Sequence, residues 1–134
     1  MMLESYKQQF DTRPINQMLG STLVEQRAGY GRILLTRTNE TPKGIGGSLH
    51  GGVLATMLDE AMLVAVFADM GDGEQPAGTA ELNISYLRPA HGDKVFATAI
   101  EVKRGRQLAV IDVDITDSDD RLCAKGRVTY AFRV

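Results

Sequence analysis

The chain has 134 residues, 43% of them hydrophobic and 24% charged, which fits one globular domain, residues 1–134, and is too short for two cores. A net charge of −2, with acidic and basic residues interspersed, excludes the basic footprint of a nucleic-acid-binding protein. The single cysteine excludes an intrachain disulfide and fits a reducing compartment. The first ten residues lack the apolar core of a signal peptide, and the longest apolar run, Ala61 to Ala68, is far shorter than a membrane span of roughly 20 residues. We therefore expect a cytoplasmic protein with no membrane partner.

The chain before residue 50 predicts short elements separated by proline and glycine. Pro14 divides the first helical segment, because proline cannot continue a helix from its interior. Gly29-Tyr30-Gly31 indicates a three-residue hairpin loop. The predicted segments are two helical pieces within Leu3–Leu19, hairpin strands Ser21–Ala28 and Arg32–Thr38, and a glycine-rich loop Asn39–Leu49.

The segment from His50 to about Met70 predicts a helix that is apolar almost all the way round, and such a helix is normally buried. Asp59 and Glu60 nevertheless lie in its middle, where an ionised carboxylate is costly without a partner. Helix geometry separates the two acids by about 100°, so they face different surroundings. Asp59 shares its face with Gly52 and other small residues, which leave room for a ligand, and we expect Asp59 to be the functional acid.

The remainder predicts four strands, with alternating apolar and polar residues. Their predicted ranges are Thr79–Leu87, Asp93–Lys103, Gln107–Thr116 and Arg121–Phe132. Helices and strands are segregated along the chain, which favours an α+β fold with an antiparallel sheet over a βαβ series. One long apolar helix and six strands predict a sheet wrapped around that helix.

The motifs in this order resemble the PaaI-type hotdog-fold acyl-CoA thioesterases. The similarity rests on His50-Gly51-Gly52 at the start of the apolar helix, on the acid nine residues after the histidine, and on Leu82-Asn83-Ile84-Ser85-Tyr86-Leu87-Arg88-Pro89-Ala90. It covers the chain from about Leu19 to Phe132. The resemblance implies a hotdog fold, a homodimer or a dimer of dimers (a homotetramer), active sites at the dimer interface, an acyl-CoA substrate, and no metal or other cofactor.

The resemblance also implies roles for individual residues. Asp59 corresponds to the family's acid, which acts as general base or as nucleophile on the thioester carbonyl. The backbone N–H of Gly51 corresponds to the donor that polarises the carbonyl oxygen, a contribution worth about 3 kcal/mol in well-studied enzymes. Thr79 matches a Ser or Thr near the water or the acid. His50 shapes the start of the helix, and Gly52 beside it borders the substrate.

One position departs from the family pattern. Relatives often carry Asn or Gln six residues before the motif histidine, where the amide orients the acid, the water or the carbonyl. Here that position is Gly44. Asn39 and Thr41 are the nearest candidates to replace the amide, if the glycine-rich loop is offset.

A basic cluster at the turn between the predicted strands Asp93–Lys103 and Gln107–Thr116 suggests where coenzyme A phosphates bind. Arginine pairs bidentately with phosphate, and the candidates are Lys103, Arg104 and Arg106, together with Arg88. The alternative is a solvated hairpin turn. Cys123 and His91 also raise the alternative of a thiol nucleophile, but no third partner is evident, so we expect a structural cysteine.

Each candidate also has a structural alternative. Asp59 and Glu60 could lie on an exposed stripe, His50 could only cap the helix, the two glycines could serve close packing, and Thr79 could be an ordinary strand residue. For function, the sequence favours hydrolysis of an aryl- or medium-chain acyl-CoA. The competing classes are a non-catalytic acyl-CoA binding or sensing module and a structural oligomerisation domain.

Overall fold

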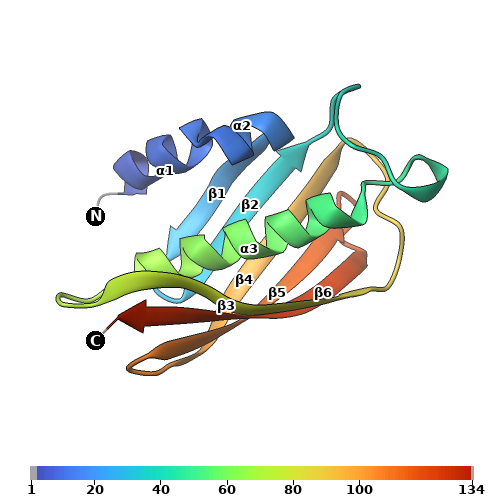
Figure 1. The fold of residues 1–134 in the computed structure, drawn as a ribbon. Helices are drawn as coiled ribbons and strands as arrows, with labels where there is room; N and C mark the ends of the chain where they lie inside the picture. The colour runs from blue at the N-terminus through green and yellow to red at the C-terminus, as the bar shows by residue number, and fades with distance from the viewer. Residues whose placement is uncertain (1–2, 134) are drawn as a thin grey trace.

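The structure is a computed structural model that describes residues 3–133. Six strands form one antiparallel sheet in the order β1-β2-β4-β5-β6-β3, curled around the long helix α3 (Figure 1). The helices are α1 (Leu3–Thr12), α2 (Pro14–Leu19), the short 3-10 helix η1 (Ile45–Gly47) and α3 (Gly51–Ala68). The strands are β1 (Ser21–Arg27), β2 (Tyr30–Thr36), β3 (Gln75–Tyr86), β4 (Lys94–Arg104), β5 (Leu108–Asp117) and β6 (Leu122–Arg133). The predicted α+β class, an antiparallel sheet wrapped around a central helix, is confirmed.

The core lies between α3 and the inner face of the sheet. Every second residue of β5 points inward and is buried, as Ile111, Val113 and Ile115 show, while Asp112 and Asp114 lie on the outer face and pair with β6. By length and hydropathy α3 could cross a bilayer, yet 56% of it is buried inside this fold. Its apolar circumference is therefore that of a core helix.

Glycines on two strands let α3 approach the sheet closely. A Cβ at Gly31 on β2 would lie 2.7 Å from the side chain of Val64, and one at Gly126 on β6 would lie 2.7 Å from Leu58. Both distances are too short for a real Cβ, so a side chain at either position would push the helix away. These contacts fix the height of α3 above the sheet, and with it the position of every side chain that the helix carries.

The N-terminal helices pack beside α3 at the end of the sheet formed by β1 (Figure 1). Pro14 separates them as predicted, and Gly20 ends α2 in a left-handed conformation with φ 75°. Tyr6 and Phe10 of α1 and Leu19 of α2 are buried in the core. The two helices thus cover one flank of α3.

Several boundaries differ from the prediction by a few residues, and three of these differences have a structural cause. The β1–β2 turn contains only Ala28 and Gly29, because Tyr30 and Gly31 pair in the sheet and Gly31 is needed under α3. Helix α3 ends at Ala68, not near Met70, since Asp69 already leaves helical geometry. Strand β3 begins at Gln75, four residues early, because its first residues continue to pair with β6 through a bulge.

Candidate active site

The start of α3 has an ordered set of backbone N–H groups. His50 caps the helix: its Nδ1 accepts the N–H of Gly52 at 2.9 Å, and its carbonyl accepts the N–H groups of Val53 and Leu54. Within residues 3–133 the N–H of Gly51 has no protein partner. This leaves one donor, at the positive end of the helix dipole, open to a substrate oxygen. His50 thus caps the helix, and it is the cap that leaves this particular donor open.

Tyr86, at the end of β3, holds the first turn of α3 in place. Its hydroxyl donates to the carbonyl of Gly51 at 2.7 Å, and its ring would lie 3.2 Å from a Cβ at position 51. A cavity of about 520 Å³ opens here. We name it the helix-start cavity; it is lined by Gly44, Ile45, Ser48, Leu49, His50, Gly51, Leu54 and the segment Tyr86–Ala90. Arg88 therefore borders the same cavity as Gly51.

Asp59 and Thr79 are brought together in the middle of the molecule. The hydroxyl of Thr79 donates to Oδ1 of Asp59 at 2.7 Å. Asp59 lies on the less buried stripe of α3 together with Ala55, Thr56 and Leu63. The pairing of β3 with β6 is irregular on both sides of Thr79, and such bulges are common where a strand aims a side chain at a site.

Glu60, the neighbouring acid, is held in a different environment. Its carboxylate is 7% exposed and accepts from Arg13 at 3.0 Å and from Asn16 at 3.0 Å. Burial raises its pKa above the ordinary value, and Arg13 and the Asn16 hydrogen bond oppose this only in part. Glu60 therefore joins α3 to the chain around α2, whereas Asp59 faces open space.

A second cavity is lined in part by neighbours of the Asp59–Thr79 pair. We name it the aromatic pocket; it measures about 350 Å³ and is lined by Tyr6, Gln9, Phe10, Arg13, Leu63, Phe67 and Tyr130. Tyr130 lies opposite Thr79 in the β3–β6 ladder, and Leu63 lies one turn after Asp59 on α3. No sequence pattern marks this pocket, because α1, which covers it, carries no recognisable motif.

One chain does not bring Gly51 and Asp59 to the same point. They are eight residues apart on α3, which is about 12 Å along the helix axis. A thioester carbonyl polarised by the Gly51 N–H is therefore out of reach of the Asp59 carboxylate of the same chain. The two predicted catalytic groups form two half-sites, one at Gly51 and Tyr86, the other at Asp59 and Thr79.

No amide side chain replaces the one that relatives carry at position 44. Gly44 lines the helix-start cavity, and its N–H donates to the Ser48 carbonyl at 2.7 Å. Asn39 lies in a separate depression with Lys43 and Asp93. Thr41 is buried, and its hydroxyl accepts the N–H of Thr38. Neither Asn39 nor Thr41 lines the helix-start cavity, so neither side chain takes the place of an amide at position 44 within this chain.

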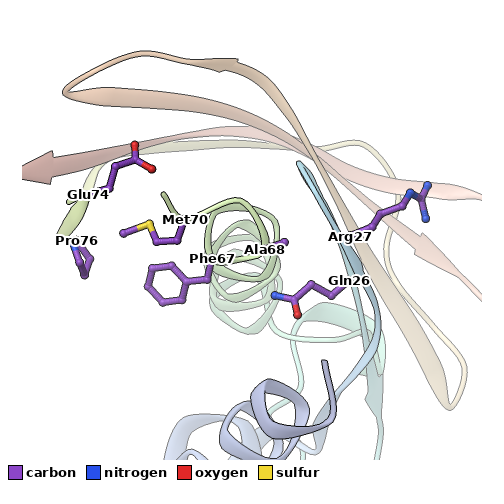
Figure 2. A pocket seen from close by; sticks show the side chains of 7 residues that line it. All are labelled: Gln26, Arg27, Phe67, Ala68, Met70, Glu74 and Pro76. Carbon is purple, nitrogen blue, oxygen red and sulfur yellow. The ribbon is translucent and has the colours of Figure 1, made fainter. Parts of the chain in front are cut away.

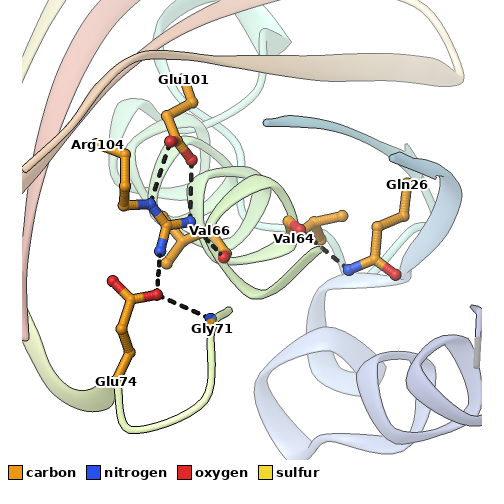
Figure 3. A network of polar contacts seen from close by, with 7 residues as sticks. All are labelled: Gln26, Val64, Val66, Gly71, Glu74, Glu101 and Arg104. Atoms are coloured by element: carbon orange, nitrogen blue, oxygen red, sulfur yellow. Dashed lines mark hydrogen bonds and ion pairs between the residues drawn. The ribbon is translucent and has the colours of Figure 1, made fainter. Parts of the chain in front are cut away.

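The predicted basic cluster divides into members with different surroundings. Arg104 donates to both carboxylate oxygens of Glu101, to Glu74 and to the Val66 carbonyl at the end of α3 (Figure 3). The structure thus gives Arg104 a structural role that clamps α3 and the start of β3 to β4. Lys103 and Arg106 are exposed, and Arg88 lies near the opposite end of α3. Phosphate binding by these three stays a prediction.

A third cavity, of about 460 Å³, lies at the C-terminal end of α3. We name it the end cavity. Figure 2 shows Phe67 turned toward Met70 and Pro76, with Gln26 and Arg27 of β1 on the other side of the helix. Phe67 lines this cavity and the aromatic pocket alike.

Cys123 is completely buried, and burial raises the pKa of its thiol. A buried thiol with a raised pKa is a poor nucleophile. His91 is exposed. The structural interpretation of the cysteine agrees with this placement.

Comparison with known proteins agrees with the fold and the motifs. Residues 46–124 match the thioesterase superfamily. Human acyl-coenzyme A thioesterase 13 is 30% identical over 128 residues, covering 94% of this chain and 90% of that protein. The medium/long-chain acyl-CoA thioesterase YigI of Salmonella typhimurium is 29% identical over 133 residues, covering 87% and 84%.

Solved structures of thioesterases share the fold of this chain. Zebra fish thioesterase superfamily member 2 has a TM-score of 0.85 at 28% identity, over 99% of both chains. The PaaI protein of E. coli shares the fold with a TM-score of 0.83 at 22% identity, over 98% of this chain and 92% of that one. The chain therefore belongs to the thioesterase superfamily, and within it is a PaaI-type hotdog thioesterase. The predicted family is confirmed.

Replacing Arg104 with alanine should destabilise the protein. The change leaves Glu101, whose side chain is 9% exposed, without its ion-pair partner, and loss of one partner from a buried pair costs about 3 kcal/mol. Urea denaturation should show a lower midpoint at an unchanged slope. Arg106→Ala, on an exposed side chain two residues away, should change stability by less than about 0.5 kcal/mol. Equal stability of the two variants would contradict the structural role of Arg104.

The raised pKa of Glu60 makes stability depend on pH. The folded state binds the Glu60 proton more tightly than the unfolded state, so this contribution is fully present below the unfolded pKa and is lost as pH rises through the folded pKa. Glu60→Gln keeps the oxygen that accepts from Arg13 and Asn16 but removes the charge. The unfolding free energy of the wild type, relative to that of this variant, should therefore fall as pH rises from 4 to 8. Glu40→Gln, in an exposed loop, should show no such trend; a constant wild-type to Glu60→Gln difference would refute the assignment.

Proposed function

We propose that this protein hydrolyses acyl-CoA thioesters, with Asp59 as the general base. The observation that carries this proposal is the 2.7 Å hydrogen bond from Thr79 to Asp59, next to Tyr130 and Leu63 of the aromatic pocket. Thr79 occupies Oδ1 and fixes the carboxylate, so Oδ2 is left to take a proton from water. The water oxygen then attacks the thioester carbon, the C–S bond breaks, and the proton passes to the departing thiolate.

The oxyanion formed in this attack needs a donor that the chain supplies at Gly51. The Gly51 N–H is preorganised by the His50 cap and by Tyr86, and such donors act on charge that develops only in the transition state. Because Nδ1 of His50 accepts a hydrogen bond, the proton of the neutral ring lies on Nε2. We assign to this Nε2–H the polar contact that the amide at position 44 provides in relatives.

Two copies of the chain would join the half-sites. Strand β3 pairs only with β6 in the described part of the chain, so its other edge is open, and an open edge strand is a template for pairing. Thr79 lies near the start of β3, and Tyr86 lies at its end. If β3 pairs antiparallel with its own copy about a two-fold axis between Leu82 and Asn83, Thr79 of one chain lies opposite Tyr86 of the other. Asp59 of one chain then meets Gly51 of its partner.

The same arrangement gives the substrate a path. The thioester lies in the helix-start cavity of one chain, and the acyl group extends past Asp59 of the other. Arg88 borders the helix-start cavity and can meet a polar part of coenzyme A, while Lys103 and Arg106 are exposed candidates for its phosphates. Glycine at position 44, in place of an amide, is the feature that favours the second candidate function, acyl-CoA binding without turnover.

Asp59→Asn should abolish hydrolysis while leaving the oligomer intact. Loss of a general base lowers the rate by about 10²–10⁴, measured as release of free thiol from a panel of acyl-CoAs. Thr79→Val, which removes the hydroxyl at similar volume, should lower kcat, and Thr79→Ser should restore it. A wild type that is stabilised thermally by acyl-CoA but releases no thiol would establish the binding module instead.

Mixed oligomers test whether two chains form each site. Gly51→Pro removes the N–H at the first helical position, where proline is tolerated, and should lower activity about 10²–10³-fold. Unfolding and refolding this inactive variant with inactive Asp59→Asn should restore activity, because a mixed dimer has one site with neither change. Random pairing predicts about a quarter of wild-type activity.

Gly51→Ala is the matched control for the proline variant. Its Cβ meets the same Tyr86 ring, but its N–H is kept. Any activity that Gly51→Pro loses beyond the loss in Gly51→Ala is therefore due to the missing N–H. Each variant refolded alone should stay inactive. A mixture that also stays inactive, with mixed dimers demonstrated by mass spectrometry of tagged chains, would contradict the shared site.

A further inference from the structure

The aromatic pocket continues the helix face that carries Asp59. Leu63 and Phe67 follow Asp59 by one and two turns, and residues at this spacing lie on one face of a helix. Across from them, Tyr130 pairs with Thr79, whose hydroxyl binds Asp59. The charge of Asp59 also contributes to the raised pKa of Tyr130, after burial, which is the main cause. The pocket therefore begins beside the proposed catalytic carboxylate.

The lining of the pocket is mainly aromatic, with Gln9 and Arg13 as its polar members. Phe67 meets Tyr6 and Tyr130 edge to face, at ring-centroid distances of 6.2 and 6.1 Å. Tyr6 and Tyr130 are only 5% and 4% exposed, so their rings are held in the wall of the pocket. A volume of about 350 Å³ is roughly twice that of the ~150 Å³ engineered cavity that takes up benzene. It suits an aromatic ring or a short alkyl chain.

Phe67 closes the pocket on the side away from Asp59. Its side chain also lines the end cavity of about 460 Å³, and Figure 2 shows its ring between the helix and Pro76 of β3. The two cavities thus share Phe67 as a wall. Without the ring, a path would continue along α3 from Asp59 to Met70.

We propose that the aromatic pocket receives the acyl group of the substrate, and that Phe67 limits this group to about the length of one aromatic ring. This inference rests on the proposed function, since it places the substrate of the same reaction. We therefore expect the protein to hydrolyse compact acyl groups in preference to long chains. The determinant is one aromatic side chain on the core helix, supported by Tyr6 and Phe10 of α1.

The test measures kcat/KM for acetyl-, phenylacetyl-, hexanoyl- and palmitoyl-CoA below their micellar concentrations. The wild type should favour phenylacetyl- and hexanoyl-CoA over palmitoyl-CoA. Phe67→Ala should raise the palmitoyl-to-hexanoyl ratio at least about tenfold, because merging the cavities makes room for further methylene groups. Leu63→Trp should lower the phenylacetyl-to-acetyl ratio at least about tenfold by filling the pocket.

Controls separate pocket shape from general damage. Leu108→Trp makes the same substitution at an exposed position on β5 and should leave both ratios unchanged. If Phe67→Ala does not fold, Phe67→Leu takes its place. Its side chain stays apolar but is smaller than phenylalanine, so the palmitoyl-to-hexanoyl ratio should rise by a smaller factor. Uniform loss of activity toward all four substrates in folded Phe67 variants, with both ratios constant, would overturn the inference. A wild type that hydrolyses none of the four would instead overturn the proposed function.

Discussion

The close contact between α3 and the sheet is the constraint on which the rest of the structure depends. Gly31 and Gly126 remove the side chains that would hold the helix away, and the helix is consequently surrounded by protein on most sides. Polar groups on such a helix are tolerated only where a partner or an opening exists. Asp59 and Glu60 occupy the two places that meet this condition, one at an opening beside β3 and the other against α2. The positions of the acids thus follow from how the helix is buried.

The sequence predicted those parts of the fold and site that depend on local pattern. Strand alternation and the apolar helix yielded the element order, and small residues beside Asp59 distinguished it from Glu60. The start of β3 was missed because Gln75 to Gly78 show no alternation and are held by pairing with β6. The hairpin loop was placed too late because Gly31 was interpreted as a turn residue, whereas it serves the approach of α3.

Partnerships across the chain were beyond the reach of sequence patterns. Arg104 stood in a basic run typical of phosphate binding, yet it pairs with Glu74, which lies 30 residues away just before β3, as well as with the nearby Glu101. Arg13 and Asn16, which pair with Glu60, are more than 40 residues away from it. Neither spacing nor composition records such contacts, because they arise only when the elements pack. The aromatic pocket escaped notice for the same reason.

The contact that satisfies Glu60 also sets the shape of the proposed substrate pocket. Arg13 pairs with Glu60 and at the same time lines the aromatic pocket, so the segment that neutralises a buried acid is the one that roofs the cavity. The space next to Asp59, the preceding residue, in turn needs α1 to stay in place. Pairing Glu60 therefore serves both needs at once: it relieves the cost of the buried acid and anchors α1 over the space next to Asp59. In this fold the N-terminal helix α1 and Arg13 after it line the proposed substrate pocket, although no motif marks them.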